Sequence, residues 1–244
     1  MKILAIDCGN TRLKCAWFED AALAEAKALD YRDFPALEAA LKARGGRFGQ
    51  PERIVVSNVA GDKVRGQLAR ALQVLDAEPL WIRARARQCG VTNLYSDPGQ
   101  LGSDRWAALI GAWMRERGAC LVVGAGTATT VDALSVAGEF LGGLILPGLD
   151  MMREALSAGT AGLSLVAGRD AEFPRNTADA IWSGCMAAQL GAIERMRHRL
   201  PESASILMSG GAARLLQPAL NRPGNVVDNL VLEGLAQIAM DQTT

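Results

Sequence analysis

The sequence predicts an α/β protein built from two related domains, and two observations lead to this prediction. Short apolar runs alternate with segments of helical spacing, which is the order β-α-β-α-β. A strand, a turn of small residues and a returning strand open the chain, and the same pattern recurs near its middle. When the first pattern is shifted along the sequence by one fixed number of residues, it aligns with the second. Identical residues then coincide: Leu4 with Leu121, Gly9 with Gly126 and Ala16 with Ala133. We therefore expect domains at residues 1–118 and 119–244.

The first half begins with the apolar run 3–6, a Gly/Asn turn and a second strand at 13–18, which together predict a hairpin. Residues 20–45 are rich in Ala, Leu, Glu and Lys and predict a helix that ends at Gly45–Gly46. The run 54–59 predicts a buried strand. The remaining expected elements are a helix at 62–77, a strand at 80–82, a loop at 92–103, and a helix that begins at Asp104 or Arg105 and ends at Gly118.

The second half predicts the repeated hairpin from strands at 121–125 and 130–134. A strand at 140–146 ends at Pro147–Gly148, and residues 159–176, rich in Gly and Ala, predict a connection. The other expected elements are helices at 149–158, 177–198 and 230–240, and a strand at 205–208.

Composition excludes several classes of protein. Half of the residues are hydrophobic, which predicts a globular core. The 26 basic residues balance the 26 acidic ones, so we expect no nucleic-acid partner. Five scattered cysteines without a CxxC pair indicate neither a disulfide framework nor a zinc site. The apolar run at the N-terminus is too short for a signal peptide and no run reaches the length of a membrane span, so we expect a cytoplasmic protein without a membrane partner.

The first candidate site is the segment from Asp7 to Lys14, here called the first loop. Glycine lets backbone N–H groups approach an anion, and Asn10 and Thr11 add side-chain donors. Lys14 supplies a positive charge for phosphate, and Asp7 is suited to hold Mg²⁺ through water. The alternative is a plain hairpin with an Asx turn. The candidate phosphate-binding residues are Asp7, Cys8, Gly9, Asn10, Thr11, Arg12, Leu13 and Lys14.

Two further turns are candidate phosphate or nucleotide contacts. Gly126–Thr130, here called the second loop, offers small residues and hydroxyls, although a β-turn in a Thr-rich hairpin would look the same. Ser209–Gly210–Gly211 follows a strand, where bare backbone suits a nucleotide base and ribose; alone this signal is weak.

A fourth candidate is Gly102–Ser103–Asp104–Arg105, because a helix N-terminus favours anions. Arg105 could clamp a substrate carboxylate, and Asp104 could accept a proton from a substrate hydroxyl. The alternative is an ordinary helix cap followed by a surface arginine.

Taken together, these segments resemble type III pantothenate kinases, which belong to the acetate and sugar kinase/Hsp70/actin superfamily. The matching segments are IDCGNTRLK at 6–14, NLYSDPGQLGSDRW at 93–106, GTATTVD at 126–132, NTADAI at 176–181 and SGGAA at 209–213. The resemblance implies two ribonuclease-H-like domains with a cleft between them. It also implies phosphorylation of pantothenate by ATP to 4′-phosphopantothenate, the first step of coenzyme A biosynthesis.

The resemblance also implies roles for single residues. Asp104 would be the catalytic proton acceptor, and Asp7 would serve Mg²⁺. Thr177 would reach the substrate of the neighbouring subunit in a homodimer. The residues implied in binding pantothenate are Tyr95, Gly102, Ser103, Asp104, Arg105 and Thr177, and those implied in binding ATP outside the first loop are Gly126, Thr127, Gly210 and Gly211.

One position departs from the family pattern. The family usually has an aspartate, associated with a monovalent cation, where this chain has Gly124. A glycine supplies no carboxylate, so we expect weak or absent activation by K⁺ or NH₄⁺. Two other functions remain open: a kinase of the same superfamily for another hydroxylated small molecule, and an accessory or regulatory protein that keeps the kinase fold.

Overall fold

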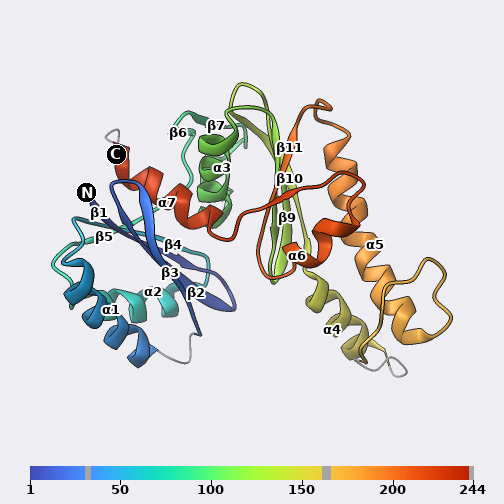
Figure 1. Ribbon diagram of the computed structural model, residues 1–244, viewed down its shortest axis with the longest axis horizontal. Helices are drawn as coiled ribbons and strands as arrows, with labels where there is room; N and C mark the ends of the chain where they lie inside the picture. The colour runs from blue at the N-terminus through green and yellow to red at the C-terminus, as the bar shows by residue number, and fades with distance from the viewer. Residues whose placement is uncertain (31–33, 161–165, 242–244) are drawn as a thin grey trace. The chain divides into compact units, whose positions relative to one another are not determined.

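The computed structural model describes residues 1–30, 34–160 and 166–241, which fall into two compact units (Figure 1). The first unit comprises Met1–Arg117, Gly138–Phe140 and Asn229–Thr244, and the second comprises Gly118–Ala137 and Leu141–Asp228. Both units combine a β-sheet with helices, so the predicted α/β class is confirmed. The domain boundary at residues 118 and 119 stays a prediction, as does a cleft between the domains.

The sheet of the first unit has the strand order β3-β2-β1-β4-β5. The first three strands run antiparallel, whereas β4 pairs parallel with β1 and β5 pairs parallel with β4. The parallel pairs need helical crossovers, which is why helices separate these strands along the chain. The strands are β1 (Lys2–Cys8), β2 (Arg12–Glu19), β3 (Ala22–Asp30), β4 (Arg53–Asn58) and β5 (Pro79–Trp81).

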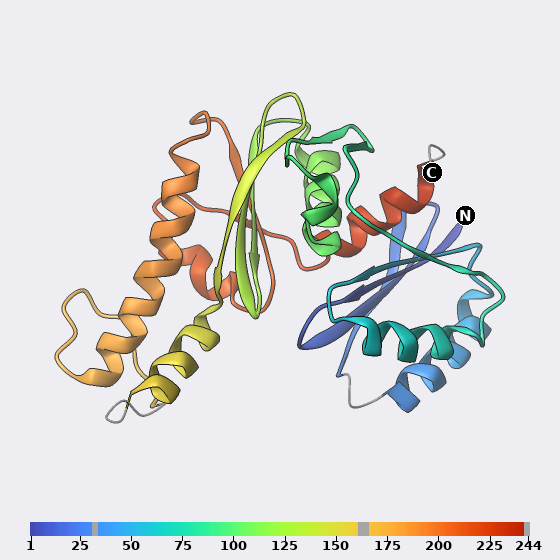
Figure 2. The same cartoon turned by 180° about the vertical axis from the view of Figure 1, so that it is seen from behind.

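Helices cover both faces of this sheet. On one face, α1 (Phe34–Phe48) and α2 (Asp62–Leu72) lie side by side (Figure 2). They enclose the even-numbered side chains of β1, such as Leu4 and Ile6. On the other face, α3 (Ser103–Glu116) and α7 (Leu230–Met240) pack against each other and contact β4. Because side chains alternate along a strand, Asp7 points to the face that carries α3 and α7.

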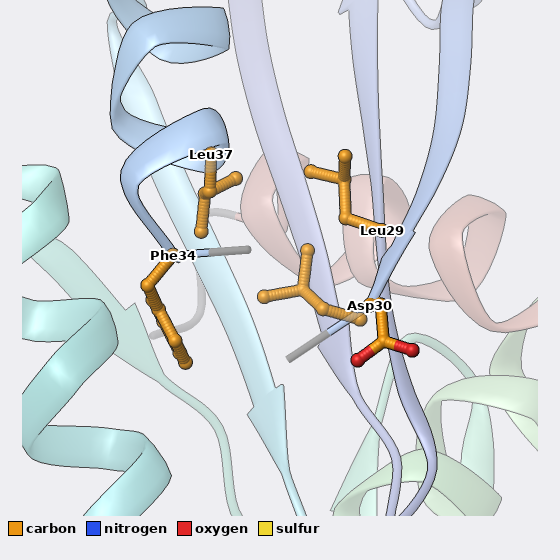
Figure 3. A pocket seen from close by; sticks show the side chains of 5 residues that line it. Leu29, Asp30, Phe34 and Leu37 are labelled. Atoms are coloured by element: carbon orange, nitrogen blue, oxygen red, sulfur yellow. The ribbon is translucent and has the colours of Figure 1, made fainter. Parts of the chain in front are cut away.

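An apolar recess lies beneath the start of α1 (Figure 3). It is too small to admit a water molecule. We interpret it as an edge of the core and not as a binding site. It is lined by Leu13, Leu29, Asp30, Phe34 and Leu37.

The helix predicted at residues 20–45 is wrong in its first part, because residues 22–30 form β3. Asp20 and Ala21 both have positive φ values, 47° and 70°, and make the tight turn that sends the chain back along β2. Alanine, glutamate and lysine alternate in this segment, and most of its side chains are exposed. Pairing with β2 therefore overrides the helical preference of these residues.

The predicted end of this helix at Gly45–Gly46 is also wrong, because α1 continues to Phe48. A glycine within a helix costs only about 1 kcal/mol relative to alanine. The Phe48 ring stacks on Trp17, with ring centroids 5.6 Å apart. This contact with the sheet favours the last turn of the helix in spite of the glycines.

The second sheet has the strand order β12-β11-β8-β9-β10-β7-β6, in which β7 (Val91–Asn93) and β6 (Arg87–Gln88) are short, and the repeated hairpin is confirmed as the antiparallel pair β8–β9. β11 pairs parallel with β8, as β4 does with β1. The strands are β8 (Cys120–Ala125), β9 (Ala128–Leu134), β10 (Glu139–Pro147), β11 (Ser205–Ser209) and β12 (Asn225–Val226). The helices are α4 (Leu149–Gly159), α5 (Thr177–Arg197), α6 (Ala213–Leu216) and the 3₁₀ turn η3 (Gln217–Ala219).

Within the described part of the chain, no helix combines the length and the apolar character that crossing a membrane requires.

Candidate active site

Three side chains from neighbouring strands lie side by side at the end of β1. Asp7 pairs in register with Lys14 on β2 and with Ser57 on β4. Residues in register across a sheet share a face, so all three side chains point towards α3. Lysine and serine therefore flank a carboxylate at the edge of the buried sheet.

Asp7 is held in an environment that disfavours its charge. Its Oδ1 atom is shielded from water and has no hydrogen-bond partner among the described residues. Burial raises the pKa of Asp7 to about 7, the negative charge of Asp104 adds to the rise, and Lys14 and Ser57 oppose it. A buried carboxylate oxygen without a partner is suited to a cation or to a water that a cation holds.

The rest of the first loop divides into core and turn. Cys8 and Leu13 bury their side chains against α1 and α2, so any contact of theirs with phosphate would come from the backbone. Gly9 is half-buried in the turn between β1 and β2. The residues of this turn with exposed side chains are Asn10, Thr11 and Arg12.

The start of α3 differs from the sequence prediction. We expected the helix to begin at Asp104 or Arg105, but it begins at Ser103, its N-cap is Gly102, and no side chain caps the helix there. The Asp104 carboxylate instead accepts a hydrogen bond from the Arg105 N–H at 2.8 Å. A Cβ at position 102 would lie 2.7 Å from Asp104 Oδ1, so glycine leaves the space that this carboxylate occupies. Steric fit at Asp104 therefore explains why the capping residue has no side chain.

Asp104 is itself half-buried. Burial raises its pKa, while the backbone N–H and the positive charge of Arg105 act in the opposite direction. Asp104 and Asp7 are close enough for the charge of Asp104 to affect Asp7. The structure thus brings together the two carboxylates to which the sequence assigned chemistry.

Arg105 is buried, with only 7% of its surface exposed, so the alternative of a surface arginine is wrong. Its guanidinium donates to the Tyr95 hydroxyl, with both Nη atoms 3.4 Å from the oxygen. Its Cζ atom lies 6.0 Å from the centre of the Tyr95 ring and 5.8 Å from that of Phe140. Two aromatic rings therefore surround a positive charge that is already desolvated.

Sequence reasoning missed Asn93, Phe140 and Ser57. Asn93 orders the loop that carries Tyr95: its Oδ1 accepts the Tyr95 N–H at 3.0 Å, and its Nδ2 donates to the Pro98 carbonyl at 3.2 Å. Phe140 pairs in register with Asn93, where β10 meets the short strand β7 (Val91–Asn93). This cross-strand contact between distant segments left no signal in the sequence.

Ser57 had a signal in the sequence, because it is a polar residue in an apolar strand. Its Oγ lies 2.9 Å from Ser103 Oγ, and both residues are buried. Buried hydroxyls are almost always hydrogen-bonded. The pair therefore links the end of β4 to the first residue of α3.

A cavity of about 400 Å³ opens beside Gly102 and Ser103. The Arg65 guanidinium stacks over the Trp81 ring in its wall, 4.6 Å from the ring centre. The residues that line it come from the ends of β4 and β5, the starts of α2 and α3, and the loop before α3: Val56, Asn58, Val59, Gly61, Asp62, Arg65, Trp81, Ile82, Arg83, Ala84, Gly99, Gln100, Leu101, Gly102 and Ser103.

The second unit holds the second loop by backbone contacts. The Gly148 N–H donates to the Thr127 carbonyl at 2.8 Å, and a Cβ at position 148 would collide with Gly126 and Thr127. Gly210, with φ at 101°, lies against Ala125 in the same way, so a side chain at position 210 would collide with the Ala125 carbonyl. Glycines on two sides therefore allow the backbone of this loop to pack closely.

Other candidates in this unit are exposed. Thr127 and Gly211 face solvent, and Thr177 is the exposed first residue of α5. The Asn176 side chain caps α5 by accepting the Asp179 N–H at 2.9 Å. Gly124 pairs with Thr130, whose Oγ1 would lie 2.7 Å from a Cβ at position 124. A larger residue at 124 would have to displace Thr130.

No group of three or more His, Cys, Asp or Glu side chains in the described ranges is arranged to hold a metal ion. A cation at Asp7 would therefore take most of its ligands from water and from a bound phosphate, which is how Mg²⁺ is usually held.

Known structures first define the fold. A protein from Campylobacter jejuni, described as a conserved Baf family transcriptional activator, is 22% identical, with 96% of each chain covered and a TM-score of 0.63. An activator of 2-hydroxyisocaproyl-CoA dehydratase from Clostridium difficile, solved with ADPNP, is 13% identical, covers 98% of this chain and 94% of its own, and has a TM-score of 0.56. Neighbours of this kind show the actin-like ATPase fold of two ribonuclease-H-like domains, as predicted.

Sequence comparison then gives the family. The family model for type III pantothenate kinase matches residues 3–199. A type III pantothenate kinase from Aromatoleum aromaticum is 49% identical over 98% of both chains, and one from Nitrosospira multiformis is 46% identical over 98% of this chain and 91% of its own. The chain belongs to the type III pantothenate kinase family, and the predicted resemblance is confirmed.

Proposed function

We propose that this protein transfers the γ-phosphoryl group of ATP to the primary hydroxyl of pantothenate, giving 4′-phosphopantothenate and ADP in the first step of coenzyme A biosynthesis. Membership of the family supports this reaction. The observation that carries the proposal to particular residues is the half-buried Asp104 at the start of α3, beside Arg105 and close to Asp7.

In this mechanism Asp104 accepts the proton of the pantothenate hydroxyl as its oxygen attacks the γ-phosphorus. The new O–P bond forms while the bond between the γ-phosphorus and the bridging oxygen breaks, and ADP leaves. Burial supports this role, because a carboxylate whose pKa is raised is a stronger base than one in water. A general base contributes about 10²–10⁴-fold to rate.

Arg105 and Tyr95 would bind the carboxylate of pantothenate. The desolvated guanidinium favours an anion that can accept two parallel hydrogen bonds. Gly102 and Ser103 would border the same substrate, because they lie beside Asp104 and line the cavity at the start of α3.

For ATP, we propose contacts with the first loop from Asp7 to Lys14, with Gly126 and Thr127 of the second loop, and with Gly210 and Gly211. Lys14 beside Asp7 supplies a positive charge where phosphates would lie. Asp7 would hold Mg²⁺, and its unpartnered Oδ1 fits that role. Bound there, the ion would neutralise charge on the transferring phosphates.

We also propose a homodimer in which Thr177 of one subunit reaches the pantothenate of the other. Several large apolar side chains of the second unit are exposed, and an interface between two copies would remove such side chains from water. Equilibrium sedimentation should give a mass of two chains; a single-chain mass at micromolar concentration would refute the dimer. The exposed apolar side chains of the second unit proposed for this interface are Leu141, Ile145, Met151, Leu156, Val166 and Phe173.

The proposed reaction takes place where ATP is available, so we expect a cytoplasmic enzyme. We expect little dependence on K⁺ or NH₄⁺, since Gly124 offers no carboxylate.

A coupled ADP-release assay tests the function. The purified protein should release ADP only when pantothenate is added, and other hydroxy acids and sugars should give little signal. ADP release that follows another hydroxylated compound would move the protein to a different substrate. Absence of any acceptor-dependent release would favour an accessory protein.

A further inference from the structure

Ser57 is a polar residue in a place that favours apolar ones. It ends the buried stretch of β4, its three predecessors are Ile54, Val55 and Val56, and none of its surface is exposed. A buried hydroxyl that lacks a partner costs about 1–3 kcal/mol. Its partners therefore account for its presence at this position.

The two partners of Ser57 fix the direction of its hydrogen bonds. Ser57 lies in register with Asp7 on the neighbouring strand, where its hydroxyl lowers the pKa of the Asp7 carboxyl, and its Oγ lies 2.9 Å from Ser103 Oγ. When Asp7 is ionised, as it would be with a bound cation, its carboxylate only accepts, so Ser57 donates its single proton to Asp7. Ser103 then donates to Ser57, and in this state the bonds run from Ser103 through Ser57 to Asp7.

This order determines which oxygen of Asp7 stays available. Oδ1 has no hydrogen-bond partner among the described residues, so the bond from Ser57 falls on Oδ2. Held by one oxygen, the carboxylate cannot rotate freely about its last bond. Oδ1 therefore keeps a fixed direction for a cation or a phosphate-bound water.

The same hydrogen bonds also connect to the segment that carries Asp104, the proposed general base. Ser103 is the first residue of α3 and directly precedes Asp104, and no side chain caps the helix at Gly102. The bond from Ser103 to Ser57 consequently ties the first helical turn to the sheet. A small shift of this turn would move the Asp104 carboxylate relative to Asp7.

We propose that Ser57 and Ser103 act as positioning residues that hold Asp7 and Asp104 in a fixed relation for phosphoryl transfer. The pair, called here the hydroxyl bridge, does not itself contact the reacting atoms. The inference rests on the proposed kinase function, and misplacement of about 1 Å in such a site can cost about 10²-fold in rate.

The test uses the variants Ser57→Ala, Ser103→Val and Ser103→Thr. The valine and threonine side chains have similar shapes, but only threonine has a hydroxyl. The double variant Ser57→Ala/Ser103→Val completes a cycle. Ser205→Ala is the matched control, because Ser205 lies on a strand of the second unit and its buried Oγ has no hydrogen-bond partner in the described structure. Removing that hydroxyl should cost nothing.

Three readouts separate positioning from a general loss of structure. They are kcat and KM for pantothenate, the affinity for Mn²⁺ in the presence of ADP, and the thermal midpoint. The electron paramagnetic resonance signal of free Mn²⁺ gives the affinity. Ser57→Ala should lower kcat about tenfold with little change in KM, and weaken Mn²⁺ binding several-fold. Ser103→Thr should retain clearly more activity than Ser103→Val. The double variant should be no slower than Ser57→Ala, because both changes break one chain of bonds.

The inference is overturned if Ser57→Ala keeps kcat and Mn²⁺ affinity within about twofold of wild type, if the two single losses multiply in the double variant, or if Ser103→Val matches Ser103→Thr. Loss of activity that follows a lowered thermal midpoint in every variant would assign the bridge a purely structural role and would also overturn it. A wild-type protein that fails to phosphorylate pantothenate would instead refute the proposed function.

Discussion

The two units open with the same strand arrangement but carry different chemistry at the same point. Asp7, near the end of β1, lies between Lys14 and Ser57, whereas Gly124, near the end of β8, lies between Thr130 and Ser209. The sheet position is equivalent, yet only the first unit has charged groups there. In the second unit, close backbone packing against glycine takes their place.

The difference teaches how a repeated fold can divide the work of one reaction. A carboxylate beside a lysine can bind a cation and a phosphate, but burying these charges costs desolvation free energy. A turn of small residues exposes backbone N–H groups and lets a ligand approach closely. We therefore expect the first unit to be sensitive to loss of charge and the second to gain of volume.

Removing the charge in the first unit should have the largest effect. Asp7→Asn keeps the shape of the side chain but not its charge, so we expect kcat to fall by about 10²-fold or more. Asp228→Asn is the matched control, because Asp228 is exposed and its ion pair with Arg214 lies at the surface. An Asp7→Asn enzyme with near wild-type turnover would remove the basis of the comparison.

Adding volume in the second unit should act mainly on stability and ATP binding. In Gly210→Ala, a Cβ would collide with the Ala125 carbonyl at a φ of 101°, so we expect a loss of about 2 kcal/mol or more in the free energy of unfolding. Gly66→Ala tests the same change where a Cβ meets no atom within 4 Å, in the exposed face of α2. Denaturant unfolding should show Gly66→Ala at least as stable as wild type, and equal losses in both variants would contradict the packing argument.

The pH dependence of stability gives a smaller and independent test. Because burial raises the pKa of Asp7 to about 7, the folded protein binds a proton that the unfolded chain has lost above its ordinary value near 3.8. The contribution of Asp7 therefore falls as the pH rises from about 4 to about 7 and is constant above that range. Asp7→Asn should gain thermal midpoint relative to ligand-free wild type over this range, by a few degrees. A difference independent of pH would show that Asp7 titrates normally.

The smallest expected effect concerns monovalent cations. Because Gly124 has no carboxylate and Thr130 occupies the adjacent space, initial rates in K⁺ and in a large organic cation should agree within about twofold. A strong K⁺ requirement would mean that another group supplies such a site.

Motifs predicted the local features of the site better than its assembly. The turns at Asp7 and Gly126 and the helix start near Asp104 follow from short-range patterns of glycine, hydroxyl and charge. The burial of Arg105 between Tyr95 and Phe140 depends on β10 returning to β7, and no short-range pattern records such a contact. The strand β3 was mistaken for a helix because its alanines, glutamate and lysine favour helices, while pairing with β2 decides the outcome.

The central claim is that the first unit carries the base for phosphoryl transfer. The most direct measurement follows ATP, ADP and 4′-phosphopantothenate by ³¹P NMR in the presence of pantothenate, with wild type and Asp104→Asn side by side. Wild type should form 4′-phosphopantothenate and ADP in equal amounts, and the variant should do so about 10²-fold more slowly or worse while its thermal midpoint and ATP affinity stay near wild type. Equal rates from a folded Asp104→Asn enzyme would contradict the account.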